Sequence, residues 1–144
     1  MTADSDLQIR RAGSRASYLA PSQNFTGEVH VEMLQTPSGN ERASAGSVSF
    51  TPGARTAWHS HPLGQTLIVT AGVGRIQRWG GPVEVIRIGD VIHIPPHTKH
   101  WHGAALDSAM THIAITEMLN GSAADWMEQV SDEQYRADFT GQAN

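Results

Sequence analysis

Short apolar runs and apolar–polar alternations fill the middle of the chain, from about residue 28 to residue 117. Gly, Pro and Asn separate these runs at the intervals typical of an all-β sandwich or barrel, and helical periodicity is absent there. Turns are predicted at residues 51–53, 79–82 and 88–90. Because the runs are rich in Val, Ile and Thr, strands are predicted at residues 29–34, 47–50, 66–70, 74–78, 83–86, 91–94 and 109–116.

The pattern changes near the end of the chain, after residue 120. Ser122 and Asp125 have the spacing of a helix start, and Ser131 and Gln134 repeat that spacing. Two short helices are therefore predicted within residues 121–138, after the last strand.

The length of the chain, 144 residues, fits one domain with a single core. We therefore predict one domain over residues 1–144, with its barrel core at about residues 25–118. The formal net charge is −4 and like charges form no run, so neither nucleic acid nor a membrane is an expected partner. The first six residues carry acidic rather than basic side chains, and no apolar segment of signal or membrane-spanning length follows. This predicts a cytoplasmic protein.

Most of the eight histidines gather in two short segments, one near position 60 and one near position 100, and the chain has no cysteine. Side chains alternate between faces in a strand, so His59 and His61 point the same way. By the same alternation His100 and His102 share a face, with Trp101 on the opposite one. Without cysteine, a bound metal must take imidazole, oxygen or thioether ligands. The two segments therefore predict a metal site.

Gln65 follows a turn formed by Pro62, Leu63 and Gly64, which can return its amide oxygen over the first histidine pair. Three imidazoles and one amide oxygen leave open positions on an octahedral metal, and catalysis needs such positions. Donors of this kind accept Mn, Fe, Co, Ni or Zn, so ligand type does not select the metal.

The spacing resembles the two cupin motifs, in the forms Gly53-x5-His59-x-His61-x3-Gln65-x6-Gly72 and Gly89-x5-Pro95-x4-His100. Gln65 stands where the first motif usually has glutamate. In the second motif His97 replaces glycine and Ala104 replaces asparagine. The resemblance covers most of the chain and implies a single-domain cupin, a double-stranded β-helix or jelly-roll barrel, here with short C-terminal helices.

A closer resemblance, carried by residues 55–72, 99–105, 110–115 and 125–128, is to the bacterial manganese-dependent cupin hydroxynitrile lyases. These enzymes cleave cyanohydrins such as mandelonitrile into an aldehyde and hydrogen cyanide. The resemblance implies a lyase that holds Mn²⁺ with His59, His61, Gln65 and His100 and uses His102 and His112 as acid/base groups.

The neutral amide of Gln65 supports a lyase on physical grounds. A glutamate would lower the charge of the site, whereas glutamine leaves a divalent ion a stronger Lewis acid and a worse reductant for oxygen. Such an ion would lower the pKa of a cyanohydrin hydroxyl, a neutral imidazole would take the proton, and cyanide would leave. Histidine suits both proton transfers near neutral pH. Which of His102 and His112 is the base stays open.

Small residues can make room for a substrate beside these histidines. If His112 faces inward, alternation sends Ala114 and Thr116 the same way. The predicted substrate-binding residues are Val48, Phe50, Thr56, Ala114 and Thr116, with Gly46 on the same wall.

Two other functions stay open. Cupins with a glutamine-bearing site can also activate oxygen, so a metal-dependent dioxygenase or other oxidative cleavage enzyme is the first alternative. The second is a non-catalytic cupin that binds a small molecule. In each case the expected partner is a small molecule.

The remaining aromatic and basic residues have structural explanations. Trp58, Trp101 and Trp126 are expected to pack or to form a subunit interface, since cupins often dimerise through strand exchange and pair again. The resemblance thus implies a homodimer or homotetramer. Arg55 is expected to be a surface charge, or else to brace the barrel mouth or orient substrate. Three histidines are expected at turns or on the surface: His30, His93 and His97.

Overall fold

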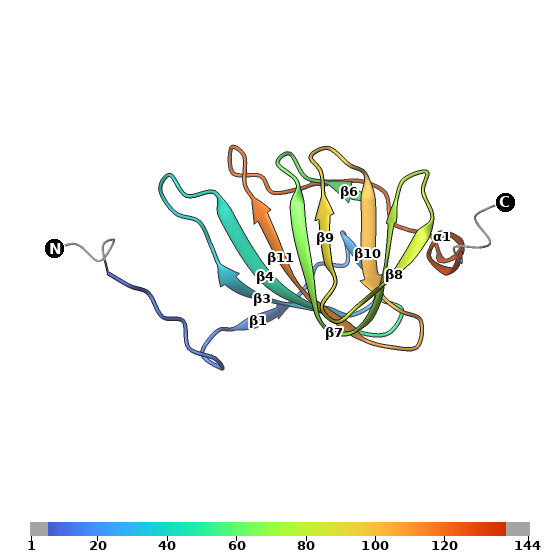
Figure 1. Cartoon of the computed structure of the whole chain (residues 1–144), viewed down its shortest axis with the longest axis horizontal. Helices are drawn as coiled ribbons and strands as arrows, with labels where there is room; N and C mark the ends of the chain where they lie inside the picture. The colour runs from blue at the N-terminus through green and yellow to red at the C-terminus, as the bar shows by residue number, and fades with distance from the viewer. Residues whose placement is uncertain (1–5, 138–144) are drawn as a thin grey trace.

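Two curved layers of antiparallel strands face each other in the computed structural model, which describes residues 6–137 (Figure 1). The first layer contains, in order, β1 (Ser17–Leu19), β3 (Val29–Gln35), β4 (Ala43–Phe50), β11 (Met110–Glu117), the first half of β7 (Gln65–Arg78) and β9 (Val91–Ile94). The second contains β8 (Val83–Arg87), the second half of β7, β10 (His100–Ala104) and the short strands β5 (Arg55–Thr56), β6 (His59–Ser60), β2 (Phe25–Thr26) and β12 (Asp125–Trp126). One helix, α1 (Asp132–Arg136), follows the strands.

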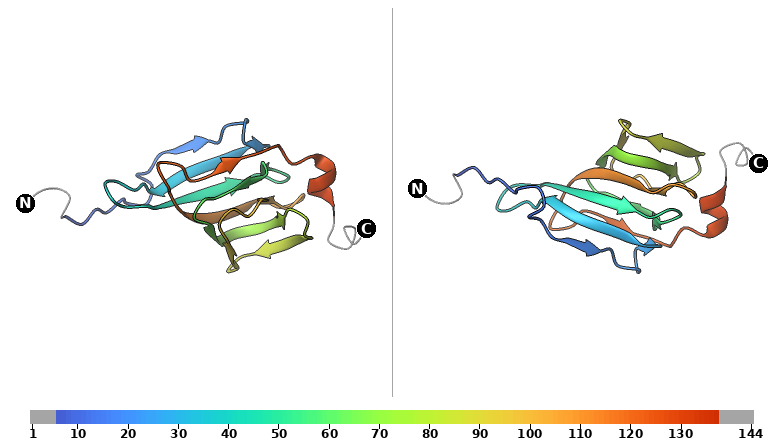
Figure 2. Two further views of the ribbon diagram at one scale, coloured as in Figure 1. Left: turned by 90° about the horizontal axis from the view of Figure 1, so that it is seen from above. Right: turned by 90° about the horizontal axis from the view of Figure 1, so that it is seen from below.

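The prediction of an all-β barrel is confirmed. Among the described residues β8 and β9 each pair only with β7, so the barrel is open along the gap between these two strands. Figure 2 shows the layers stacked, with the N-terminal arm and α1 at opposite ends of the molecule. No helix in the described part of the chain is long and apolar enough to cross a membrane.

The long strand β7 joins the two layers. Its first half pairs with β9 and β11, and its second half pairs with β8 and β10. Gly72 lies at the crossing with a φ of +74°, and a Cβ at this position would overlap the carbonyl oxygen of Ala109. Only glycine fits this approach at positive φ. The strands predicted at residues 66–70 and 74–78 are therefore one strand that bends from one layer into the other.

The sheet begins earlier than the predicted barrel core. β1 lies before residue 25 and pairs with β3, with Leu19 opposite His30. Residues 1–5 of the acidic N-terminus and residue 138, the last of the predicted helical segment, lie outside the described residues.

One of the two predicted helices is wrong. Asn120 and Gly121 have positive φ values of 53° and 81° and form a tight turn, closed by a bridge between Leu119 and Ser122. The chain then forms β12, whose ladder with β6 satisfies the backbone groups that a helix would have paired internally. The second predicted helix is confirmed as α1, and its capping box joins Ser131 and Gln134 as expected.

Arg55 anchors the C-terminal segment, and the expectation of a surface charge is wrong. The residue is only 5% exposed. The guanidinium donates to the carbonyl of Val130 and to the carboxylate of Asp132, both at 2.8 Å, and lies 4.6 Å from the centre of the Tyr135 ring. Tyr135 packs with Trp58 and Trp101 on the outer side of the second layer. The last described residues are therefore fixed against the barrel.

Candidate metal centre

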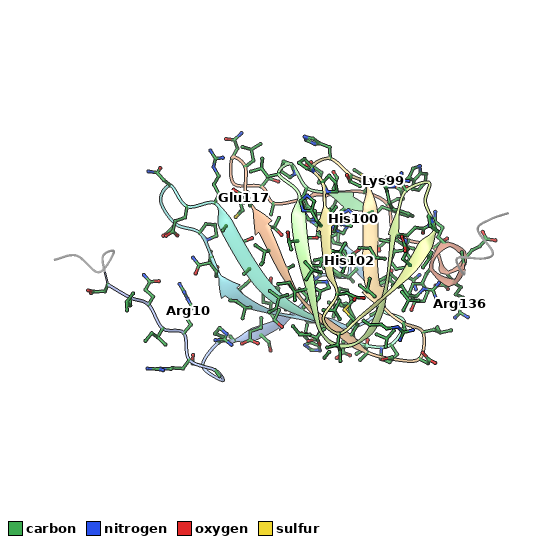
Figure 3. All side chains as sticks on the ribbon, in the orientation of Figure 1. Arg10, Lys99, His100, His102, Glu117 and Arg136 are labelled. Carbon is green, nitrogen blue, oxygen red and sulfur yellow. The ribbon has the colours of Figure 1, made fainter. Side chains whose placement is uncertain are left out.

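Three buried histidines meet between the layers. His59 comes from β6, and His61 follows it. His100, labelled in Figure 3, begins β10 and lies directly opposite His59 in the ladder. One ring nitrogen of each lies within 4.8 Å of those of the other two. The predicted cluster is therefore one that could hold a metal ion.

Main-chain carbonyls orient the three rings. The Nδ1 atoms donate to the carbonyl oxygens of Ala57 for His59 (2.8 Å), Ala123 for His61 (2.7 Å) and Thr98 for His100 (2.8 Å). A carbonyl oxygen can only accept, so Nδ1 carries the proton in a neutral ring and Nε2 keeps its lone pair. The Nε2 atoms of His61 and His100 are buried without a hydrogen-bond partner. These free lone pairs fit a metal ion.

Gln65 completes the set of donors. It begins β7 directly after Gly64, whose φ is +81° and at which a Cβ would lie 2.7 Å from the carbonyl oxygen of Ile94, so the predicted turn requires glycine. Its Nε2 donates to the hydroxyl of Thr116 at 3.0 Å. Its Oε1 is buried without a partner. The three imidazoles and this amide oxygen suit a divalent cation.

Burial keeps the three rings neutral. Loss of hydration lowers the pKa of His100 to about 4 and also lowers that of His61. For His59 burial is again the largest cause, and the neighbouring imidazoles of His100 and His61 lower its pKa further. Neutral imidazole is the form that binds metals.

A second pair of histidines lies beside the cluster. His112 on β11 and His102 on β10 approach to 3.0 Å between Nε2 of His112 and Nδ1 of His102. His102 is the nearer to the candidate metal ligands, with its ring 5.3 Å from that of His59 and 5.6 Å from that of His100. The Nε2 of His102 and the Nδ1 of His112 are buried without partners. Burial lowers the pKa of both, that of His112 to about 4, and the His112 imidazole lowers that of His102 further.

Both groups of histidines contribute to the lining of a small cavity of about 190 Å³. His59, His61 and Gln65 line it together with His102 and His112. The residues predicted to contact substrate all line the same cavity: Val48, Phe50, Thr56, Ala114 and Thr116. Gly46 is buried beside Met33 and is not among the lining residues.

The sequence did not indicate four further residues of the cavity wall: Phe25, Ala123, Ala124 and Trp126. Trp126 lies 4.7 Å from the His59 ring and 5.5 Å from the Phe25 ring, measured between centroids. The only available signal was the resemblance over residues 125–128. No local pattern says that the chain returns to the first histidine segment.

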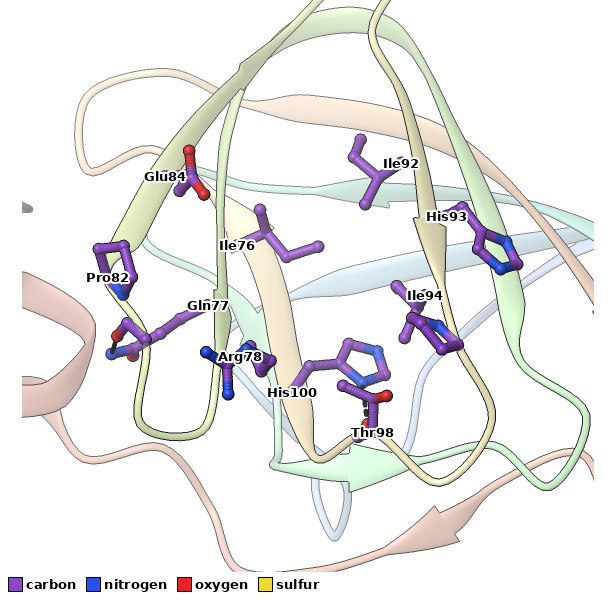
Figure 4. Close-up of a pocket in the computed structure, with 12 residues that line it drawn as sticks. Ile76, Gln77, Arg78, Pro82, Glu84, Ile92, His93, Ile94, Thr98 and His100 are labelled. Atoms are coloured by element: carbon purple, nitrogen blue, oxygen red, sulfur yellow. Dashed lines mark hydrogen bonds between the residues drawn. The ribbon is translucent and has the colours of Figure 1, made fainter.

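A larger cavity of about 270 Å³ lies between β7, β8, β9 and β10 (Figure 4). Ile76, Ile92 and Ile94 line it, and of the candidate ligands only His100 reaches it. It contains neither His102 nor His112, so we assign the chemistry to the smaller cavity. The three other histidines are exposed as expected: His30, His93 and His97.

Comparison of the sequence with known proteins finds a matching family and a similar enzyme. The sequence-family model of the cupin domain matches residues 46–116 of this chain. An (R)-mandelonitrile lyase of Granulicella tundricola is 57% identical over 130 residues, which cover 90% of this chain and 99% of that protein.

Solved structures show the same fold. A cupin-like protein of Thermotoga maritima is 44% identical, with a TM-score of 0.80 over 93% of this chain and 98% of its own. The polyketide cyclase RemF of Streptomyces resistomycificus is only 14% identical, with a TM-score of 0.72 over 92% of each chain. The second likeness concerns the fold alone.

Proposed function

The chain belongs to the cupin family, and we propose that it is a metal-dependent hydroxynitrile lyase that cleaves or forms cyanohydrins such as mandelonitrile. One observation carries the proposal. The hydrogen-bonded pair of His102 and His112 shares a small cavity with three of the four candidate metal ligands, His59, His61 and Gln65. The name of the relative from Granulicella tundricola supports the substrate class.

The proposed metal is Mn²⁺, held by His59, His61, Gln65 and His100. The resemblance to manganese-dependent lyases supports this choice, and the same donors would accept Fe, Co, Ni or Zn. When bound, a divalent ion supplies Lewis acidity toward a substrate hydroxyl oxygen. The neutral amide of Gln65 preserves the positive charge of the site and so favours this role over oxygen chemistry.

The histidine pair can exchange the proton of the reaction. One of the two facing nitrogens must donate and the other accept. If Nδ1 of His102 donates to His112, the Nε2 of His102 has a free lone pair for the substrate hydroxyl proton. The O–H and C–CN bonds then break, the aldehyde C=O bond forms, and the imidazolium returns the proton to cyanide. We therefore propose His102 as the base and His112 as the residue that orients it and shares its charge.

The cavity favours small apolar substituents on the substrate. At about 190 Å³ it lies below the range of roughly 300–1,000 Å³ typical of sites for drug-sized ligands. Its walls beside the histidines are apolar, formed by Phe25, Val48, Phe50 and Ala114. One aryl ring or a short alkyl chain suits this space.

The test is the release of benzaldehyde and hydrogen cyanide from mandelonitrile by metal-loaded protein. His102→Ala and His112→Ala are expected to retain metal and to lower kcat by about 10²- to 10⁴-fold, the usual contribution of an acid/base group. His59→Ala serves as the control that weakens the metal site. Absence of release above this control, with metal bound to the wild type, would rule out the lyase. Substrate-dependent oxygen uptake would instead indicate an oxidative enzyme.

We also propose that the chain forms a homodimer or homotetramer. The N-terminal arm extends away from the layers (Figure 1), and its Leu7 and Ile9 are 93% and 65% exposed. A second copy would remove these side chains from water. The molar mass from light scattering should exceed that of one chain and should fall in a double variant, Leu7→Asp with Ile9→Asp. A monomeric wild type would contradict this proposal.

A further inference from the structure

The four candidate ligands are oriented in two different ways. The rings of His59 and His100 donate to the carbonyls of Ala57 and Thr98, each two residues earlier in the chain. Their orientation is therefore a local property of the segments that carry them.

The other two ligands depend on a distant segment. His61 donates to the carbonyl of Ala123, which lies 62 residues away in sequence, and Gln65 donates to the hydroxyl of Thr116, which lies 51 residues away. Thr116 lies near the end of β11, and Ala123 lies on the connection that leads from β11 to β12. We infer that the end of β11 and the connection after it, residues 116–123, position half of the candidate metal site, with Thr116 as the residue that orients Gln65.

The register of the sheet places Thr116 for this task. It pairs directly with Gln65 in the ladder between β11 and β7, so the two side chains share one face. Its main-chain carbonyl accepts from the Ser44 hydroxyl at 2.7 Å, which ties β11 to β4 at the same point. Both Thr116 and Gln65 are buried. Gln65 therefore has a fixed partner in a dry environment.

The hydroxyl of Thr116 decides which way the Gln65 amide faces when a metal is present. While the Gln65 amide donates its N–H to the Thr116 hydroxyl, its Oε1 is left free for the metal site. That oxygen has no hydrogen-bond partner. Valine has the shape of threonine but cannot accept this hydrogen bond. The buried N–H would then be unpaired whenever Oε1 faces the metal, so the metal-binding orientation becomes less favourable. Loss of such an outer contact typically weakens metal binding by about 10- to 100-fold.

The turn before Ala123 fixes the other contact. Leu119 and Ser122 exchange two main-chain hydrogen bonds, at 2.9 and 3.0 Å, around Asn120 and Gly121. Gly121 has a φ of +81° and free space where a Cβ would lie. A side chain at this position therefore strains the backbone without causing a clash, and the strain lies two residues before the carbonyl that holds His61.

The decisive experiment is titration of metal-free protein with Mn²⁺, with free Mn²⁺ followed by electron paramagnetic resonance. Thr116→Val should bind Mn²⁺ about 10- to 100-fold more weakly than the wild type. Thr116→Ser restores the hydroxyl and should recover most of the affinity. Thr111→Val is the matched control, because Thr111 lies on the same strand and its hydroxyl pairs with Ser49 at 3.0 Å, away from the cavity.

A second pair of variants tests the turn. Gly121→Ala and Gly89→Ala both place alanine at a positive φ with open space around the new Cβ. The first should lower the affinity for Mn²⁺ more than the second. Wild-type affinity in Thr116→Val, an equal loss in Thr111→Val, or equal effects of the two glycine variants would overturn the inference.

The inference rests on the proposed function only in needing a bound metal. Mandelonitrile cleavage, measured on the same preparations, separates the two ideas. If the wild type cleaves mandelonitrile and Thr116→Val keeps full Mn²⁺ affinity, the positioning role is wrong and the lyase stands. If Thr116→Val loses affinity and no preparation releases cyanide, the positioning role stands and the lyase is wrong.

Discussion

Metal-free protein should lose stability steeply as the pH falls from about 6.5 to about 4. Burial lowers the pKa of His100 and of His112 from 6.5 to about 4, and it lowers that of His59 and of His102 well below the same starting value. In this pH range the folded protein keeps these rings neutral, whereas the unfolded chain protonates them. Since the unfolded state binds more protons, acid favours unfolding.

The expected loss is large for a domain of this size. For His112 alone, the change in pKa from 6.5 to about 4 corresponds to about 3 kcal/mol of unfolding free energy. This contribution is complete above pH 6.5 and is lost as the pH falls to about 4. His100 should add a similar amount. The sum of the two contributions is comparable to the net stability of a typical domain, roughly 5–15 kcal/mol. Metal-free protein should therefore unfold before the pH reaches 4.

The assay is urea unfolding of metal-free protein at a series of pH values from 7.5 to 4.5. His112→Gln removes one of the buried bases and should lower the slope near pH 5 by about 1.4 kcal/mol per pH unit. Thr111→Val is the control, because it changes no ionisable group and should leave the slope unchanged. A flat stability profile in the wild type, or the same slope in His112→Gln, would refute the reasoning.

Two further substitutions test the fold and the chemistry. Gly72→Ala should prevent folding or lower the melting temperature far more than Gly89→Ala, because only the first places a Cβ against a carbonyl oxygen. Gly89→Ala should cost about 1–2 kcal/mol of stability, because alanine is unfavourable at a positive φ. Equal melting temperatures would contradict the account of β7. Gln65→Glu should keep the metal, since the Thr116 hydroxyl can also donate to a carboxylate. The variant should cleave cyanohydrins more slowly and take up more oxygen. An unchanged ratio of the two activities would show that the neutral amide does not select the chemistry.

Local patterns predicted half of the twelve strands that the structure describes, because a half-buried strand alternates apolar and polar residues along the sequence. These are β3, β4, β7, β8, β9 and β11. The prediction divided β7 into two strands at Gly72. In the structure this glycine allows β7 to lie close to Ala109, and the chain does not reverse there. The prediction also placed a helix at Ser122, where pairing with β6 gives the backbone a strand partner instead. Both errors arise because a glycine or a capping residue allows more than one local structure.

The sequence by itself identified the candidate donor atoms of the site. Strand alternation put His59 with His61 and His100 with His102, the turn at Gly64 returned Gln65, and the cupin spacing joined the two segments. Each of these statements depends only on neighbours along the chain.

Only the tertiary structure decided how these donors are held. It placed His59 opposite His100, buried Arg55 beneath the C-terminal segment, and brought the Ala123 carbonyl to His61. Thr116, predicted to contact substrate, is hydrogen-bonded to Gln65. Contacts of this kind join residues tens of positions apart, and which distant segments meet depends on the packing of the whole barrel and not on any local pattern.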